Sequence, residues 1–454
     1  MAKKKQIELT IEEKLQNALV SKEEQPYKIP SNWCWVRLGN ITQIKGGKRI
    51  PKGTSLLKEN TGYKYIRVTD MKNGTVLNDD IHYISKDIYN KISNYTISKN
   101  DIYITCAGTI GRVGIIPVEF DGANLTENAD KIIIKHINKN LLVKVLSSYI
   151  VQKQIQEVIT TGCQPKLAIK KIEQLKIPLP PINEQQRIVE RIESLFAKLD
   201  RAKELIENTL AQFEQNKMAI LHKAFTGELT AKWRKENNID LSSWEKIKLG
   251  KVLLPMQTKK PTGQFFRYID IDAIDNKRQI VKAPKLILTE KAPSRASRGV
   301  ETGNILFSMV RPYLKNIAQI DSDLSDCIAS TGFYVCRCKP ELNSRFLYYL
   351  FIFDKTIDYL MQFMKGDNSP SIRKDDLLNM KIDLPTIEEQ QEIVNILDKL
   401  LAKYNKIKNL EQQLEKIELL KKAILAKAFR GELGTNNPDE ESAENLLKEI
   451  LAEK

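Results

Sequence analysis

Apolar side chains recur at spacings of three and four residues in two long stretches of the chain. One stretch follows Pro180 and the other follows Pro385, and charged residues lie between the apolar positions. This pattern is typical of a coiled-coil seam, and proline suits the start of a helix but not its interior. The sequence therefore predicts two long helices, which end near the Gly-Glu-Leu triplets at Gly227 and Gly431.

The predicted seam continues through several heptads in each stretch. At 1.5 Å per residue, roughly 40 residues form a rod on the order of 60 Å long. Two such rods in one chain most simply pack together, and we expect an antiparallel coiled coil, although the large connecting segment also permits parallel packing. The seam positions are Ile188, Ile192, Leu195, Leu199, Ala202, Ile206, Leu210, Phe213 and Ile220, then Ile393, Leu397, Leu400, Tyr404, Ile407, Leu410, Leu414, Ile417 and Ile424.

Both stretches belong to a longer internal repeat. Residues 177–229 align with residues 382–433, with one residue fewer in the second copy. Three shorter pairs precede them in the same order: "WCWVRLG" (33–39) with "WEKIKLG" (244–250), "YIRVTDM" (65–71) with "YIDIDAI" (268–274), and "KNDIYIT" (99–105) with "TGNILFS" (302–308). The chain therefore uses one unit twice, a globular segment followed by a long helix.

The globular segments combine strand-like openings with helical patterns at 141–159 and 344–363. The expected fold class is α+β, with two mixed α/β domains, two long helices in an antiparallel coiled coil, and a pseudo-two-fold internal repeat. The expected segments are an N-terminal helical segment (1–30), a first globular domain (31–165), a central region with its helix (166–230), a second globular domain (231–370), a C-terminal region with its helix (371–434) and a helical tail (435–454).

Length and composition agree with a multidomain protein. At 454 residues the chain is longer than one hydrophobic core usually organises. No apolar run is long enough to cross a membrane, and the N-terminus turns polar instead of continuing as a secretory signal. We therefore expect a cytoplasmic protein with no membrane partner.

The net charge of +15 points to a polyanionic partner, unless it reflects a lysine-rich organism. Residues 31–165 hold 18 Lys+Arg against 11 Asp+Glu, and residues 244–370 hold 20 against 13, so each segment carries a surplus of seven. The basic loops differ between the copies, as two domains that recognise different base sequences would require. Tyr313 is expected either to stack on DNA or contact a thymine methyl group, or to be a buried aromatic residue. The candidate DNA contacts are Lys45, Lys48, Arg49, Arg67, Arg112, Lys259, Lys260, Arg267, Arg295, Arg298, Arg311, Tyr313 and Lys315.

Motifs for catalysis or metal binding are missing from the sequence. There is no GxxxxGK[ST] phosphate loop and no Asn-Pro-Pro-aromatic methyltransferase loop, and the three histidines have no evident nucleophile partner. The cysteines lack CxxC spacing, so we do not expect a zinc site. We expect the cysteines to be reduced thiols. We infer a non-catalytic subunit. The cysteines are Cys34, Cys106, Cys163, Cys327, Cys336 and Cys338.

The ordered double set of motifs resembles the specificity subunit of type I restriction-modification systems, HsdS. The resemblance rests on "NWCWVRLG" and "WEKIKLG", on "TGCQPKLAIKKIEQLKIPLPPINEQQRIV" and "KGDNSPSIRKDDLLNMKIDLPTIEEQQEIV", and on "AFTGEL" and "AFRGEL". It covers nearly the whole chain. The polar residues Glu184, Gln185 and Gln186 within it are interpreted as solvated first-turn residues, with partner contacts on the helix faces beyond them.

The resemblance implies a DNA-binding function within a larger complex. Residues 31–165 and 244–370 would be target recognition domains, each recognising half of a bipartite, asymmetric double-stranded DNA target, with the helices as spacer. Two modification methyltransferase (HsdM) subunits and restriction (HsdR) subunits would be the protein partners. This chain would bind no cofactor, and S-adenosylmethionine, ATP and Mg would belong to the partners. The segments "TIEEKLQNALV" and "SAENLLKEILAEK" are similar to end segments that close a circular arrangement in the family.

Two other classes of protein stay open on the residues alone. One is a self-sufficient nuclease or methyltransferase, which S-adenosylmethionine binding by the isolated chain would favour. The other is a coiled-coil scaffold that binds proteins or nucleic acid without sequence preference, which a salt-sensitive, sequence-independent affinity would favour. The repeated frame with different loops argues against both.

Overall fold

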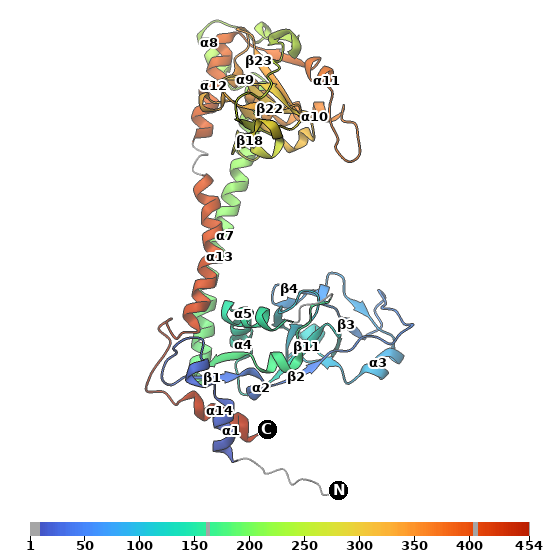
Figure 1. Ribbon diagram of the computed structural model, residues 1–454, viewed down its shortest axis with the longest axis vertical. Helices are drawn as coiled ribbons and strands as arrows, with labels where there is room; N and C mark the ends of the chain where they lie inside the picture. Colours follow the sequence, from blue (N-terminus) through green and yellow to red (C-terminus); the bar gives the residue numbers. More distant parts are fainter. Residues whose placement is uncertain (1–9, 160–163, 403–406, 454) are drawn as a thin grey trace. The chain divides into compact units, whose positions relative to one another are not determined.

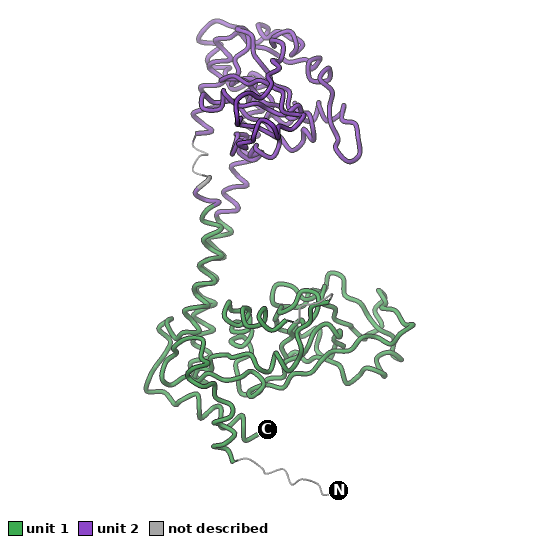
Figure 2. Tube along the Cα trace, viewed as in Figure 1, with its two compact units in different colours: residues 1–205, 412–454 green, residues 206–411 purple. Residues whose placement is uncertain are grey.

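The computed structural model describes residues 10–159, 164–402 and 407–453. The chain divides into two compact units, which are described separately: unit 1 contains residues 1–205 and 412–454, and unit 2 contains residues 206–411 (Figure 2). Each unit holds one globular domain and part of both long helical stretches. Cys163 and Tyr404 lie outside the described residues.

The globular domain of unit 1 contains two four-stranded sheets and a short hairpin (Figure 1). The first sheet is antiparallel, with strands in the order β2 (Thr42–Gly46), β11 (Ala129–Ile134), β8 (Ile102–Thr105) and β9 (Val113–Ile115). The second has the order β6 (His82–Tyr83), β3 (Lys64–Ile66), β10 (Ala123–Leu125) and β7 (Thr96–Ile97), and its β3–β10 pair is parallel. The hairpin joins β4 (Met71–Lys72) to β5 (Thr75–Val76).

Unit 2 repeats this arrangement strand for strand. Its first sheet has the order β14 (Leu253–Leu254), β23 (Phe333–Cys338), β20 (Ile305–Ser308) and β21 (Ile317–Gln319). Its second sheet has the order β18 (Lys285–Leu288), β15 (Phe265–Ile269), β22 (Ile328–Ser330) and β19 (Ala296–Gly299), with β15–β22 as the parallel pair. The hairpin is β16 (Ile274–Asp275) with β17 (Ile280–Val281). Two divergent sequences therefore build one shared frame.

The helical patterns at 141–159 and 344–363 each form two short helices. In unit 1 the chain becomes extended at Ser148, whose hydroxyl donates to the Val145 carbonyl (2.6 Å). In unit 2 it becomes extended at Phe353, whose ring stacks on Phe225 with 5.3 Å between centroids. Periodicity alone predicts each of these stretches as one continuous helix. A hydrogen bond from Ser148 to the end of α4 and the buried ring of Phe353 lie at the two breaks. The helices are α4 (Lys139–Leu146), α5 (Tyr149–Val158), α9 (Ser344–Ile352) and α10 (Asp354–Met361).

Short antiparallel strand pairs connect each globular domain to the segment that leads into its long helix. In unit 1, β1 (Cys34–Arg37) pairs with β12 (Lys176–Leu179), and in unit 2, β13 (Glu245–Lys248) pairs with β24 (Lys381–Leu384). The remaining helices are α1 (Ile11–Ala18), α2 (Leu38–Ile41), α3 (Lys86–Ile92), α6 (Ile169–Glu173), α8 (Ala231–Glu236), α11 (Lys374–Leu378) and α14 (Ala443–Ala452).

The long helices are α7 (Ile182–Phe225), α12 (Ile387–Ala402) and α13 (Ile407–Ala428). In unit 1, Asp200 pairs with Lys421 and Lys203 pairs with Glu418, so α7 and α13 run antiparallel there. The predicted seam residues Ile188, Ile192, Ile206, Ile393, Leu397 and Ile417 are buried, and Leu195, Leu199, Leu210, Phe213, Leu400 and Leu414 are partly buried. Gly227 and Gly431 follow the helix ends with φ of +80° and +75°. No helix among the described residues is both long and apolar enough to cross a membrane.

Gly114 marks a close approach between the first sheet and the hairpin of unit 1. A Cβ atom at this position would lie 2.4 Å from the Gly74 backbone and 2.5 Å from the Tyr103 hydroxyl. We expect Gly114→Ala to lower the free energy of unfolding by about 3 kcal/mol, because the backbone must shift. The control Gly46→Ala, whose Cβ would be 3.4 Å from its nearest neighbour, should change it by less than about 1 kcal/mol. Equal losses in chemical denaturation would contradict the close contact.

Candidate nucleic-acid interface

A basic loop follows strand β2 in unit 1 and crosses the end of β10. The Gly47 amide donates to the Ala129 carbonyl (3.0 Å), and the Lys48 amide donates to the Leu125 carbonyl (2.8 Å). A Cβ at Gly47 would lie 2.0 Å from the Thr126 carbonyl oxygen, so this contact requires glycine. The loop thereby holds two predicted DNA contacts, Lys48 and Arg49, in exposed positions, and a third, Lys45, is exposed near the end of β2.

The equivalent loop of unit 2 follows β14 and lies along the edge strand β19. The Lys259 amide donates to the Ser297 carbonyl, and the Gly299 amide donates to the Gln257 carbonyl, both at 3.0 Å. The loop brings Lys259 and Lys260 beside Arg295 and Arg298 of the β19 segment. Lys259, Lys260 and Arg295 are exposed, whereas the Arg298 Nε is buried without a hydrogen-bond partner. Both domains therefore place a basic loop against the second sheet, at the end of the inner strand β10 in unit 1 and along the edge strand β19 in unit 2.

Four predicted DNA contacts already have a carboxylate partner within their own domain. Arg67 pairs with Asp70 (2.7 Å) and Asp80 (3.0 Å), and hydrogen bonds from Lys58 and Arg67 lower the pKa of Asp80 to about 2. Arg267 pairs with Asp326 (2.9 Å) and Lys315 with Asp354. Arg49 pairs with Glu127 at 2.6 Å, but its side chain stays 75% exposed. Arg67, Arg267 and Lys315 thus have a structural role in these folds, and Arg49 remains accessible.

The loop between β20 and β21 presents Arg311 and Tyr313. Arg311 adopts a left-handed backbone conformation with φ of +48°, and its guanidinium donates to the Asn368 carbonyl (2.9 Å). Tyr313 is 42% exposed, so the buried-aromatic interpretation of this residue is wrong. The corresponding loop of unit 1, between β8 and β9, presents Arg112, which is exposed and donates to the Met71 carbonyl at 3.2 Å.

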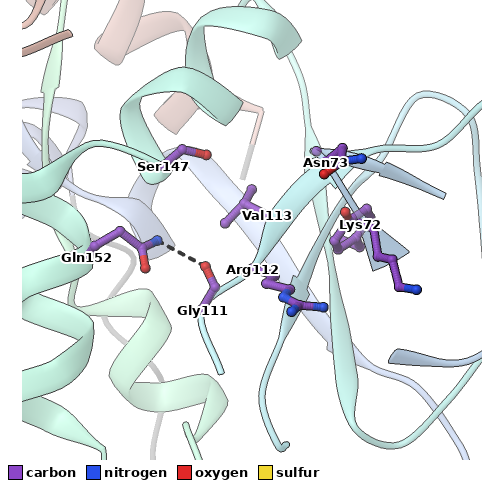
Figure 3. A pocket seen from close by; sticks show the side chains of 9 residues that line it. Lys72, Asn73, Gly111, Arg112, Val113, Ser147 and Gln152 are labelled. Atoms are coloured by element: carbon purple, nitrogen blue, oxygen red, sulfur yellow. Dashed lines mark hydrogen bonds between the residues drawn. The ribbon is translucent and has the colours of Figure 1, made fainter. Parts of the chain in front are cut away.

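Sequence reasoning missed a basic residue beside Arg112. Lys72 lies on β4 and lines a surface hollow together with Arg112 and Gln152 (Figure 3). It is exposed, and its only sequence signal is the Asn73-Gly74 turn that follows it, since Asn-Gly is the commonest tight hairpin turn.

Two polar residues in the first turn of α7 are buried, which corrects the solvated interpretation of Glu184 and Gln185. Both side chains are fully buried, and only Gln186 is exposed. The Gln185 Oε1 accepts from the Asn138 amide (2.8 Å), and its Nε2 donates to the Pro180 carbonyl (3.1 Å). The Gln186 Oε1 accepts from the Asn138 Nδ2 (2.8 Å). Because Asn138 caps α4, these two glutamines fix the start of α7 to the globular domain.

Unit 2 reproduces this arrangement with Gln390, Gln391 and Asn343. The Gln390 Oε1 accepts from the Asn343 amide (2.8 Å), and the Gln391 Oε1 accepts from the Asn343 Nδ2 (2.9 Å). Asn343 caps α9 as Asn138 caps α4. The repeated Glu-Gln-Gln motif is therefore a junction between a domain and its helix, and the buried glutamine of each copy is hydrogen-bonded within the protein.

Each junction also contains a buried glutamate bound by a tryptophan and by the segment that follows a long helix. In unit 1, Glu184 accepts from the Trp33 Nε1 (2.7 Å), the Thr435 hydroxyl (3.0 Å) and the Asn436 Nδ2 (2.9 Å). In unit 2, Glu389 accepts from the Trp244 Nε1 (2.9 Å), the Thr230 hydroxyl (2.6 Å) and Arg234. Thr230 follows α7, and Thr435 follows α13. The segment after α13 therefore binds the glutamate at the start of α7, and the segment after α7 binds the glutamate at the start of α12.

The tail completes unit 1 by packing against its N-terminal segment. Helix α14 places Leu447 and Ile450 in the same core as Leu15 and Ala18 of α1. The Asn32 side chain donates to the Asn437 carbonyl (2.9 Å), and the Ala443 amide donates to the Asn32 carbonyl (2.9 Å). The two segments that resemble closing ends in the family therefore contact each other in this unit.

The cysteines among the described residues are unpaired thiols: Cys34, Cys106, Cys327, Cys336 and Cys338. Burial raises the pKa of Cys34 and Cys106 to about 12, so both are protonated at neutral pH. Within the same described residues, no group of three or more His, Cys, Asp or Glu side chains could hold a metal ion.

Asp130 on β11 gives the stability of unit 1 a pH dependence. Burial raises its pKa to about 6, above its ordinary value of 3.8. The folded state therefore binds the proton more tightly than the unfolded state, and this contribution to stability is lost as pH rises from about 4 to about 6. Asp130→Asn changes the free energy of unfolding at each pH. We expect this change to be more stabilising at pH 8 than at pH 3 to 4, by about 3 kcal/mol. Chemical denaturation at both pH values measures the free energy of unfolding, with Asp79→Asn at an exposed position as the control. An equal effect of Asp130→Asn at both pH values would contradict the raised pKa of Asp130.

The comparisons with known proteins identify the class. The sequence profile of the type I restriction modification DNA specificity domain matches residues 30–212 and 244–419, and the chain belongs to this family. It is 35% identical to the EcoBI specificity subunit of Escherichia coli over 221 residues. These aligned residues are 48% of this chain and 46% of that protein. It is 26% identical to the StySPI specificity subunit of Salmonella potsdam, over 94% of this chain and 96% of that protein.

Solved structures share the fold. A chain from a structure of complex assembly and conformational transition of the type I R-M system matches with a TM-score of 0.67 and 20% identity, over 90% of this chain and 100% of that chain. The HsdS subunit from Thermoanaerobacter tengcongensis matches with a TM-score of 0.55 and 22% identity, over 90% and 99%. The predicted fold class and family are confirmed. Proteins of this family confer DNA sequence specificity within complexes with methylase and restriction subunits, and do not themselves catalyse the reaction.

Proposed function

We propose that this chain selects a bipartite, asymmetric DNA target for a type I restriction-modification complex. In this proposal each globular domain recognises one half of the target, and the long helices set the unread gap. Two HsdM subunits dock on the chain, and HsdR subunits join through them.

The observation that carries this proposal is the shared strand order with different loops. Both domains have the same order of strands in two sheets and the same parallel strand pair, and both place a basic loop against the second sheet. The loops themselves differ, with Lys48 and Arg49 in one and Lys259 and Lys260 in the other. A common frame with different basic side chains suits two unlike half-sites, because phosphate contacts position a protein and base contacts specify the sequence.

Equivalent exposed apolar residues at the two helix starts support docking of two identical subunits. Ile182 opens α7 and is 48% exposed, and Ile387 opens α12 and is 39% exposed. These positions correspond in the repeat, directly ahead of the buried glutamates. A partner subunit that binds the exposed isoleucine at one helix start can bind the equivalent isoleucine at the other helix start in the same way. We place S-adenosylmethionine on the methyltransferase subunits and ATP with Mg²⁺ on the restriction subunits.

The experiment is methylation mapping of host DNA by single-molecule sequencing, with this chain and its methyltransferase co-expressed. The expected result is a methylated adenine motif in two parts separated by unspecified bases, and its disappearance when the gene for this chain is deleted. The matched control deletes the gene for the methyltransferase and should abolish the same motif. A stable complex that gives no motif would contradict the proposal and favour a scaffold.

A further inference from the structure

The hairpin of unit 1 presents a fixed tip next to Arg112. Asn73 and Gly74 at the tip have φ of +53° and +73°, as a tight two-residue turn requires. The Ile115 amide donates to the Gly74 carbonyl (2.9 Å), and this ties the tip to β9. Strand β4 thus holds Lys72 in a defined position beside the Arg112 loop.

The hollow between the hairpin and α5 has a distinctive set of polar groups (Figure 3). No carboxylate lines it, and among the described residues neither Lys72 nor Arg112 has an acidic partner. The Gln152 Nε2 donates to the Gly111 carbonyl (2.9 Å) and the Leu146 carbonyl (2.8 Å). Because both amide hydrogens are used, the Gln152 Oε1 is left as an acceptor. The site therefore offers two cationic donors and a fixed neutral acceptor, and the polar side chains of Asn73 and Ser147 also line it.

The equivalent hairpin of unit 2 uses its polar groups inside the protein. Arg278 pairs with Glu411 (3.1 Å) and lies 3.9 Å from Asp275. Gln279 accepts from the Lys217 Nζ at its side chain (3.4 Å) and from the Tyr348 hydroxyl at its carbonyl (3.3 Å). That hairpin is attached to helices of its own unit, while Lys72 of the unit 1 hairpin is exposed and has no acidic partner among the described residues. Among the described residues, the polar groups of this site are therefore accessible to a ligand in unit 1, while those of the equivalent hairpin in unit 2 are bound within the protein.

We propose that Lys72, Arg112 and Gln152 form a specificity-determining DNA contact in the first recognition domain. A ligand that satisfies this site must bring hydrogen-bond acceptors to the two cations and a donor to Gln152. The edge of a base pair beside a phosphate brings both kinds of group. A simple anion brings acceptors alone. Arg112 Nη1 is held by the Met71 carbonyl, which leaves its Nε and Nη2 for the O6 and N7 of a guanine. The N4 amino group of the paired cytosine is then the donor to the Gln152 Oε1. Lys72 contacts the adjacent phosphate. This inference rests on the proposed function.

The test uses the complete complex of this chain with its methyltransferase and a duplex carrying the motif found by methylation mapping. Arg112→Gln is expected to weaken binding to this duplex by about tenfold or more, with little effect on an unrelated duplex, because base contacts carry discrimination. Arg112→Lys should not restore the preference, since lysine lacks the two-pronged geometry. Lys72→Gln should weaken binding to both duplexes and reduce the salt dependence by about one phosphate contact.

Lys91→Gln, at an exposed position of α3, is the matched control for a lost surface charge. Thermal unfolding of each variant checks that the domain stays folded. If Arg112→Gln and Lys72→Gln both bind like Lys91→Gln while the wild-type complex keeps its motif, the inference is overturned and the proposed function stands. If the wild-type complex has no motif, the proposed function itself fails.

Discussion

Removal of residues 435–454 is expected to unfold unit 1 while unit 2 keeps its structure. The deleted segment contributes Leu446, Leu447, Ile450 and Leu451 to the core of unit 1. Burial of four such side chains stabilises the fold by about 6 to 12 kcal/mol, which equals the whole stability of a typical domain. The deletion also removes Thr435 and Asn436 from the buried Glu184 carboxylate, so this polar group loses two of its donors.

Hydrogen exchange of the full and shortened chains, followed by mass spectrometry, measures this effect. Protection should disappear across residues 31–159 and persist across residues 244–370. The point variant Leu447→Asp, at a fully buried position, should act in the same direction, while Glu449→Lys on the exposed face of α14 should have little effect. Unchanged protection of residues 31–159 in the shortened chain would show that the tail is not part of this core.

Glu389→Ala is expected to destabilise unit 2 by about 3 to 5 kcal/mol. Glu389 is fully buried and neutralises Arg234, whose side chain is only 8% exposed. Removal of one partner leaves an uncompensated buried charge, which costs much more than the pair itself contributes. Glu184→Ala in unit 1 should cost less, about 1 to 3 kcal/mol, because the donors left behind there, Trp33, Thr435 and Asn436, are neutral.

Protection of residues 244–370 against hydrogen exchange, in increasing denaturant, measures this destabilisation for unit 2 alone. Glu388→Ala, one residue earlier and exposed, is the matched control. The double variant Glu389→Ala with Arg234→Met should recover part of the loss, since no buried charge remains. If Glu389→Ala is no more destabilising than Glu388→Ala, the buried network does not hold unit 2 together.

The helices were predictable because their determinants are local. Spacing placed Ile188 and Ile393 on the seam, and Gly227 and Gly431 marked the helix ends. The burial of Glu184 and Gln185 was not predictable from the helix pattern. Their partners, Trp33, Asn138 and Thr435, come from distant parts of the chain. The one available signal was that tryptophan and glutamate recur together in both copies.

The candidate DNA contacts show the same limit. Composition and loop differences identified the basic residues, but their charge partners are set by tertiary structure. Arg67 and Arg267 look as available as Arg112 in the sequence, yet Asp80 and Asp326 neutralise them from other segments. Lys72 escaped notice because its exposure beside Arg112 depends on how the hairpin folds against β9.

The most direct test of the account is an exchange of one recognition domain. Residues 244–370 are replaced by the corresponding segment of a relative with a different target, and the methylated motif is mapped by single-molecule sequencing in cells that also express the methyltransferase. The account predicts that one half of the motif changes, while the other half and the gap stay the same. A motif that changes in both halves, or in neither, would contradict the assignment of one half-site to each domain.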